Sequence, residues 1–381
     1  MLTRSGRNAL LTGAFLLIVA MLTDWIELGY LGLFLLLAVL VAVPLAWTRP
    51  RLEVGRVVDP VRVTVGRPSL GVLTVKNTSA RPIGATTAEE SIGESFKPIA
   101  LPNLAPTAQK VARYRLPTDR RAVLTIGPLR MVRQDPFGFV RFEQRRGSEE
   151  TLWVHPKRYP LASMPTSFIR SLDGPTTDSA PQGTVSFHAI RDYVHGDDRR
   201  LIHWRTTARA GKLMVKQNVD TTQPDLTLVI DTREDRIGDE DFEVAMEIAA
   251  SLAVACSDQR YPVRIRTTGG LTIQPVRNEA PAQFFLDRLA GLDRSASGSL
   301  DAVVTELTMG TGGVNLVVVT SRPEPSDLER IVSLKRRYRS MAVIDVDQRH
   351  QTPTTTPRSG ILTFQVATGA DFAMSWNRAV G

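Results

Sequence analysis

The sequence has very little cysteine and few aromatic residues, and each scarcity excludes a class of protein. Cys256 is the single cysteine among 381 residues, so an internal disulfide and a cysteine-ligated zinc cage are both excluded. Aromatic residues make up 6% of the chain and basic residues are spread along it, so we expect no nucleic-acid partner that stacks bases. No Gly-x-G-x-x-G or Walker loop follows a predicted strand, which leaves nucleotide binding without support.

Long uncharged apolar runs are present only at the start of the chain. One runs from residue 9 to about 23, and the second, residues 28–47, contains no charged residue. A helix of about 20 residues crosses the hydrocarbon core of a bilayer. Asp24 and Glu27 lie between the two runs and mark a turn. We therefore predict a two-helix transmembrane hairpin over residues 1–50.

The basic residues that flank the hairpin predict its orientation. Arg4 and Arg7 precede the first helix, Arg49 and Arg51 follow the second, and the turn contains no lysine or arginine. The positive-inside rule places both ends in the cytoplasm. We expect a multi-pass protein of the plasma membrane with a cytoplasmic soluble part, and the net charge of +8 suits anionic lipid. A signal peptide cleaved near Met21 is the alternative, but that stretch has no small-x-small cleavage site.

Two soluble segments with different periodicities follow the hairpin. Residues 51–165 alternate apolar and polar residues between closely spaced turns, which predicts a β-sandwich-like domain. Within it, residues 121–132 are predicted to form two strands separated by a break at Gly127-Pro128. Residues 225–381 alternate short apolar strands with amphipathic helices, which predicts a Rossmann-type α/β domain with a mostly parallel sheet. The clearest of these helices begins near Asp239 and has one apolar stripe from Phe242 to Cys256. Residues 166–224 form a linker with an unusual motif.

That motif, "FHAIRDYVHGDDRRLIHWRTTARAGKLMVKQ", spans residues 187–217 and combines histidines, one tryptophan and many arginines. It resembles the bacterial and archaeal family called domain of unknown function 58. The upstream element Asp135-Pro136-Phe137-Gly138 and the order of the segments also fit that family. The matching motif residues are Arg191, Asp192, Tyr193, Gly196, Asp197, Arg200, Ile202, His203, Trp204, Ala208 and Arg209.

The resemblance carries expectations about fold and function. It implies that the α/β domain is von Willebrand factor A-like, and that MoxR-type AAA+ ATPases are encoded beside such proteins. The leading hypothesis is a membrane-anchored adaptor that binds other proteins, with a MoxR-type ATPase, during assembly or maturation of complexes. A hydrolase that uses the 191–209 motif is the first alternative, and binding of anionic lipid or nucleic acid is the second. No nucleophile–base pattern identifies catalytic residues, so an enzyme is disfavoured.

Domains of the von Willebrand factor A type can hold magnesium at an Asp-x-Ser-x-Ser loop after the first strand. The corresponding loop here runs from Asp231 to Asp235. Arg233 stands where the first serine ligand would be, and a cation at that position opposes metal binding. We therefore expect no cofactor and no metal, with only a degenerate magnesium site at Asp231 and Asp235. Asp231 is expected to pair with Arg233 or with a helix N-terminus.

The histidines and carboxylates of the motif are better explained by structure than by chemistry. His188, His195 and His203 with Asp197 have no spacing that zinc sites use. We expect the aspartates at 192, 197 and 198 to pair with motif arginines and Trp204 to pack beneath them. The motif would then clamp the β-rich segment to the α/β segment, or the same surface would bind a partner, since arginine and tryptophan are common interface anchors.

Overall fold

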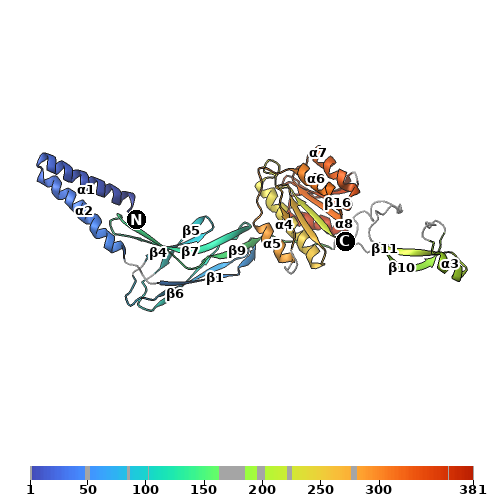
Figure 1. Cartoon of the computed structure of the whole chain (residues 1–381), viewed down its shortest axis with the longest axis horizontal. Helices are drawn as coiled ribbons and strands as arrows, with labels where there is room; N and C mark the ends of the chain where they lie inside the picture. Colours follow the sequence, from blue (N-terminus) through green and yellow to red (C-terminus); the bar gives the residue numbers. More distant parts are fainter. Residues whose placement is uncertain are drawn as a thin grey trace. The chain divides into compact units, whose positions relative to one another are not determined.

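The computed structural model describes residues 2–47, 52–83, 86–101, 103–162, 185–194, 202–220, 225–275, 281–358 and 360–380. The chain divides into two compact units, Met1–Pro156 and Lys157–Gly381 (Figure 1). Each unit is described by itself. The finer division of the sequence at residues 50, 165 and 224 stays a prediction.

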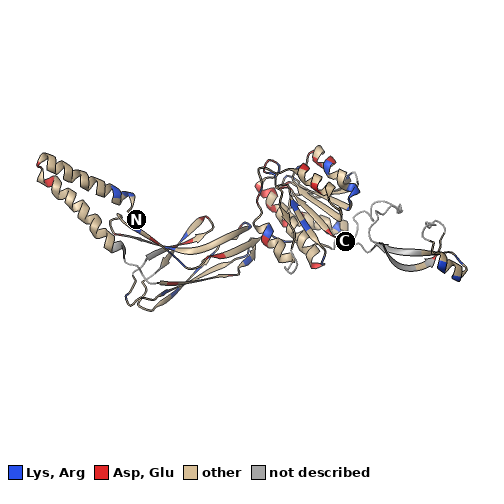
Figure 2. Ribbon diagram, in the orientation of Figure 1, with Lys and Arg blue, Asp and Glu red and all other residues tan. Residues whose placement is uncertain are grey.

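The first unit begins with two antiparallel helices, α1 (Arg4–Thr23) and α2 (Ile26–Trp47). Both are long and apolar enough to cross a membrane, and Figure 2 shows their charges at the start of α1 and at the turn. The backbones approach closely, because a Cβ atom on Gly32 would lie 2.8 Å from the carbonyl oxygen of Gly13. Small residues permit such contacts between apolar helices. The predicted helical hairpin is confirmed.

Two sheets with one shared core form the rest of this unit. The smaller sheet has the antiparallel order β1-β3-β6, and the larger has the order β2-β9-β7-β4-β5, with β8 also pairing with β7. Buried side chains such as Leu73 and Ile126 from the two sheets belong to one core, as in a sandwich. The strands are β1 (Leu52–Asp59), β2 (Arg62–Thr64), β3 (Leu70–Asn77), β4 (Thr86–Ile92), β5 (Ser95–Leu101), β6 (Gln109–Arg115), β7 (Ala122–Gln134), β8 (Arg141–Arg146) and β9 (Glu150–His155).

The predicted break at Gly127-Pro128 is wrong. Residues 122–134 form one continuous strand, β7, and the pairing with β4 shifts register between Glu90 and Ile92 instead of ending. Gly127 has a φ of 90°, a left-handed conformation that glycine adopts without strain. A bulge of this kind absorbs a glycine and a proline that would otherwise end a strand.

A seven-stranded sheet forms the core of the second unit, in the order β14-β13-β12-β15-β16-β18-β17. The five strands from β13 to β18 are parallel, and β14 and β17 are antiparallel edges. Buried Val317 and Val319 pack on one face and Leu316 and Val318 on the other, as expected when helices cover both faces. The strands are β12 (Leu226–Ile230), β13 (Val263–Thr267), β14 (Thr272–Ile273), β15 (Gly313–Thr320), β16 (Tyr338–Val346), β17 (Thr354–Arg358) and β18 (Ile361–Val366).

Helices on both faces of this sheet agree with the predicted α/β pattern. The apolar stripe of α4, from Phe242 to Cys256, is buried as the sequence predicts. Strands β17 and β18 and the final helix were not predicted. The helices are α4 (Asp239–Asp258), α5 (Pro281–Ala290), α6 (Leu300–Met309), α7 (Pro325–Ser333), the short 3-10 helix η3 (Leu334–Arg336) and α8 (Gly369–Val380).

The motif residues of the second unit form a separate hairpin. Strand β10 (Val185–Asp192) pairs antiparallel with β11 (Met214–Asp220), and α3 (Trp204–Ala210) precedes β11. Ile202 bridges to Val215, and both are buried. This local pairing positions α3 beside β11.

A buried ion pair lies in the core of the β-rich domain. Arg56 Nη2 lies 2.6 Å from Glu90 Oε1, and both side chains are fully buried. Gly127 is needed at this point because a Cβ atom there would overlap the Arg56 guanidinium group. Burial and the Glu90 charge raise the pKa of neighbouring Tyr114 to about 12. Because both side chains are buried away from water, the loss of either one would leave the charge of the other without a partner.

We predict that Glu90→Ala lowers the free energy of unfolding by about 3–5 kcal/mol, because it leaves the Arg56 charge buried and unpaired. Glu143→Ala is the matched control, since Glu143 pairs with Arg130 at 2.7 Å but its side chain is 40% exposed. The control should cost about 1 kcal/mol or less. Denaturant unfolding of the full chain in detergent measures both. Equal costs for the two variants would show that burial of the Arg56–Glu90 pair has no energetic weight.

Candidate functional site

The chain changes direction across the parallel sheet at β12. Strand β12 pairs with β13 on one side and with β15 on the other, so the connections before and after this point run to opposite edges. Ligand sites of open α/β sheets lie at such a switch point, outside the carboxyl ends of the strands. Here Asp231 follows β12 and Thr320 ends β15. The carboxyl edge at β12 and β15 is therefore the first place to examine for function.

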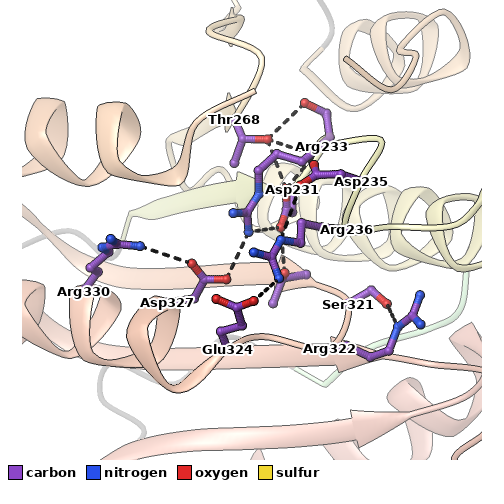
Figure 3. A network of polar contacts seen from close by, with 12 residues as sticks. Asp231, Arg233, Asp235, Arg236, Thr268, Ser321, Arg322, Glu324, Asp327 and Arg330 are labelled. Atoms are coloured by element: carbon purple, nitrogen blue, oxygen red, sulfur yellow. Dashed lines mark hydrogen bonds and ion pairs between the residues drawn. The ribbon is translucent and has the colours of Figure 1, made fainter. Parts of the chain in front are cut away.

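Asp231 is 1% exposed, and its carboxylate is surrounded by donors (Figure 3). Oδ1 accepts hydrogen bonds from Arg233 Nε at 2.9 Å and from Thr268 Oγ1 at 3.2 Å. Oδ2 accepts from Arg233 Nη2 at 2.7 Å and from Thr320 Oγ1 at 2.8 Å. Both oxygens are satisfied by side chains from three separate strand ends, so this buried carboxylate needs no further ligand.

Arg233 joins two buried carboxylates. Its Nη2 atom also donates to Asp327 Oδ2 at 3.2 Å, and Asp327, in the first turn of α7, is 3% exposed. Gly298 gives the arginine room, because a Cβ atom there would lie 2.8 Å from Arg233 Cγ. The guanidinium group thus occupies the centre of an Asp231–Arg233–Asp327 triad.

The electrostatics of the triad follow from this geometry. Burial acts to raise the pKa of Asp231, but the hydrogen bonds and charge of Arg233 outweigh it and hold that pKa below its ordinary value. The hydrogen bond from Arg233 to Asp231 likewise raises the pKa of Arg233. Both groups are therefore charged at neutral pH, and the pair is held together in a site that water hardly enters.

A second group of carboxylates lies at the same edge, around β16. Asp241 Oδ2 accepts a hydrogen bond from Ser321 Oγ at 3.2 Å, and Asp345 Oδ1 accepts from the backbone nitrogen of Arg322 at 2.7 Å. Arg322 has a φ of 48°, a conformation that non-glycine residues adopt only when their surroundings hold them there. Asp347 pairs with Arg349 at 3.1 Å. These carboxylates also have donors from the protein itself.

The two carboxylates of the predicted degenerate magnesium site, Asp231 and Asp235, do not lie together. The predicted pairing of Asp231 with Arg233 is confirmed. Asp235 does not join Asp231, because its side chain is 77% exposed and pairs with Arg236 at 3.5 Å. The site therefore has one of its two proposed carboxylates, and the Arg233 guanidinium already neutralises it. These residues do not fit a magnesium ion, because magnesium needs several oxygen ligands arranged octahedrally around it.

The motif residues are only partly described. His195, Gly196, Asp197, Asp198 and Arg200 lie outside the described residues. Among the others, Tyr193 is half-buried, Asp192 pairs with Lys212 at 2.7 Å, and Arg209 is exposed on α3. The role of the motif residues as a group stays a prediction.

His203 and Trp204 begin α3, and their environments are clear. His203 Nδ1 accepts a hydrogen bond from Thr206 N at 3.3 Å and so caps the helix. Trp204 is 67% exposed, so the expectation that it packs beneath ion pairs is wrong. Helix α3 has no buried residue, and the buried side chains beside it are Ile202 and Val215.

Several residues of the site were not identified from the sequence. Asp327 and Thr268 are 94 and 37 residues distant from their partners in the triad. The pairing of β13 with β12 brings Thr268 to Asp231, and α7 brings Asp327 to the same place. One sequence signal was available, because Thr320-Ser321 and Asp345 each stand at the carboxyl end of a buried apolar strand.

Comparisons with known proteins identify one family. Residues 189–282 match the model of the family described as protein of unknown function DUF58. No curated protein matches the chain. The CARDB domain of PF1109 from Pyrococcus furiosus is 18% identical over 28% of this chain and 93% of that chain, with a TM-score of 0.23. The alkylpurine DNA glycosylase AlkC of Pseudomonas fluorescens is 14% identical over 34% of this chain and 38% of that chain, with a TM-score of 0.22. Likenesses this low support no argument.

We predict that Arg233→Ala lowers the free energy of unfolding by about 3–5 kcal/mol at neutral pH, because the buried Asp231 carboxylate loses its ion pair, while Asp327 keeps only a 3.6 Å pair with Arg330. In this variant the pKa of Asp231 should rise above its ordinary value, so the cost should shrink as the pH falls and that carboxylate takes up a proton. The native chain should respond to pH in the opposite direction. The stability that the charged Asp231 contributes is lost as the pH falls through its lowered pKa.

Arg236→Ala is the matched control, because Arg236 pairs with Glu324, whose side chain is 52% exposed. It should cost about 1 kcal/mol or less at any pH. Denaturant unfolding of the full chain at a series of pH values measures both variants. A cost of Arg233→Ala that does not change with pH would contradict the assignment of the triad.

Proposed function

Residues 189–282 belong to the DUF58 family, and on that premise we propose that this protein is a membrane-anchored adaptor that binds other proteins. Its proposed partner is a MoxR-type AAA+ ATPase, and its proposed role is the assembly or maturation of other complexes. The helical hairpin would hold it in the plasma membrane, and the two soluble domains would present binding surfaces in the cytoplasm.

One observation carries this proposal: the exposed surface of the motif hairpin. Trp204 is 67% exposed, Val194 62% and Leu213 43%, and the cations Arg205 and Arg209 of α3 are exposed as well. We call these five residues the motif surface. Exposed tryptophan, arginine and aliphatic side chains are the residues that anchor protein–protein interfaces. The cations favour an acidic surface on the partner.

The arrangement of the motif favours binding over catalysis. A general base must have a free ring nitrogen within reach of the proton that it removes. His203 Nδ1 accepts the hydrogen bond from Thr206 N that caps α3, which places the ring proton of the neutral imidazole on Nε2 and leaves neither nitrogen free to act as a base. An adaptor therefore accounts for this histidine better than the hydrolase alternative does.

We further propose that the α/β domain is of the von Willebrand factor A type. The support is the strand order, in which β12 lies between β13 and β15, β14 is a short antiparallel edge next to β13, and an acidic loop follows β12. In this proposal the Arg233 guanidinium takes the place of a bound cation at the carboxyl edge. No metal or other cofactor would then be required for partner binding.

The proposed topology rests on charge and length. Helices α1 and α2 contain 20 and 22 residues, which at about 1.5 Å per residue suffices to cross a bilayer. Arg4 and Arg7 lie at one end of the hairpin, while Asp24 lies between the helices and Glu27 lies in the first turn of α2. The positive-inside rule then places both soluble domains in the cytoplasm.

We predict that Trp204→Ala and Arg209→Glu each weaken binding of a purified MoxR-type ATPase by about 30-fold, because loss of an interface anchor costs about 2 kcal/mol. Leu271→Ala is the control, since Leu271 is 56% exposed and lies outside the motif surface. Binding to the full chain in detergent and its melting temperature are measured together.

All three variants should melt like the native chain, because each substituted side chain is exposed. Unchanged ATPase binding by both motif variants would overturn the proposed docking role. Variants that keep the partner but lose a hydrolytic turnover would support the enzyme alternative instead.

A further inference from the structure

The turn at residues 135–140 connects β7 to β8 and is held by a single buried carboxylate. Asp135 is 5% exposed, and it accepts hydrogen bonds from the backbone nitrogens of Phe137 at 2.9 Å and Val140 at 2.5 Å. Gly138 N also donates to the Asp135 carbonyl oxygen at 3.0 Å, and Gly138 has a φ of 73°. The Asp-Pro-Phe-Gly element is therefore a rigid turn with its backbone fixed from within.

This turn also holds the start of α1. The backbone nitrogen of Thr3 donates to the carbonyl oxygen of Phe139 at 2.9 Å, and Thr3 Oγ1 donates to that of Gly138 at 2.6 Å. The same hydroxyl oxygen accepts a hydrogen bond from Gly6 N at 3.0 Å and so caps the helix. Leu2 forms an antiparallel bridge with Val140. One threonine thus joins the helix N-terminus to the turn.

The contact is close, and it includes the second helix. A Cβ atom on Gly6 would overlap the carbonyl oxygen of Phe139, so only glycine allows this approach. Ala42 of α2 is fully buried in a small core with Val140, and Phe139 packs against the same core. The turn therefore contacts both helices at the end of the hairpin where the chain enters it.

The exposed side chains at this end are of two kinds. Phe137 is 59% exposed and Leu2 is 49% exposed, although both are large and apolar. Phe137 stacks on Phe139 with ring centroids 5.9 Å apart, so its ring has a fixed position. Arg4 and Arg7 are exposed in the first turns of α1. Apolar and aromatic side chains together with arginines, at the end of an apolar helix, match the composition of the lipid headgroup region.

We propose that residues 2–7 and 135–140 form a membrane joint, in which Phe137 and Leu2 enter the lipid interface and Arg4 and Arg7 bind phospholipid phosphates. The hydrogen bonds of Thr3 make the joint rigid, so the β-rich domain is fixed to the bilayer surface instead of hanging from a tether. The inference rests on the proposed membrane insertion of the hairpin, and it assigns a role to the Asp-Pro-Phe-Gly element that partner binding does not use.

The test uses an environment-sensitive fluorophore on the full chain in phosphatidylcholine–phosphatidylglycerol vesicles. Phe137→Cys provides the labelling site, and Cys256 is buried, which protects it from the reagent. Phe96→Cys is the matched control, because Phe96 is 49% exposed and lies far from the turn. Phe96 pairs with Ser91 of β4, which lies beside the middle of β7. At ~3.3 Å per residue along β7, that position is about 25 Å from residue 135. Quenchers attached to the lipid near the headgroup report which label touches the membrane.

The label at residue 137 should shift to shorter wavelength and lose most of its fluorescence to the lipid quencher, while the label at residue 96 keeps its fluorescence. Adding Gly6→Val to the labelled chain should reduce the quenching at residue 137, because the turn is forced away from α1. Gly29→Val should leave it unchanged, since a Cβ atom there meets Ala20 Cβ at an ordinary 3.6 Å.

Equal fluorescence of the two labels in a chain that floats with the vesicles would overturn the membrane joint alone. A chain that does not float with vesicles would overturn the inserted hairpin and the joint with it. Binding of the ATPase in detergent is measured without a bilayer, so failure of the adaptor proposal would be seen separately.

Discussion

The ion pair between Asp231 and Arg233 determines the chemistry of the carboxyl edge of the α/β sheet. A parallel sheet brings the ends of several strands to one place, and in this chain those ends carry carboxylates and hydroxyls. Arg233 reaches back to Asp231 and on to Asp327, with Gly298 leaving space for its side chain. A guanidinium group supplies several donors in fixed directions, which suits two carboxylates better than a lysine would. The negative charge of these carboxylates is therefore balanced by an arginine of the same chain.

The β-rich domain follows the same physical rule. Arg56 and Glu90 are buried between its sheets, and the bulge at Gly127 opens the space that the guanidinium group fills. In both domains a glycine without a side chain permits an arginine to reach a buried carboxylate. Losing one member of such a pair leaves the other charge buried and unpaired, which destabilises the domain strongly. The surfaces that remain for binding are the exposed ones, at the motif hairpin and at the start of α1.

The sequence predicted what local periodicity determines. The apolar helices, the alternating strands and the α4 stripe were correct, and so was the pairing of Asp231 with its neighbour Arg233. The partners Asp327 and Thr268 were missed because α7 and the order of the parallel strands bring them in from distant segments. The break at Gly127-Pro128 was wrong because a bulge kept the strand intact. Trp204 was expected to pack beneath the ion pairs of the motif, whereas it is 67% exposed on a helix that has no buried residue.

The effect of magnesium on the melting temperature tests the central claim, that Arg233 takes the place of a cation at the carboxyl edge. The full chain is melted with and without millimolar magnesium, beside an Asp231→Asn variant. The melting temperature of the native chain should be the same in both conditions, because the Asp231 oxygens already have protein donors. A rise of several degrees in magnesium that Asp231→Asn abolishes would contradict the account.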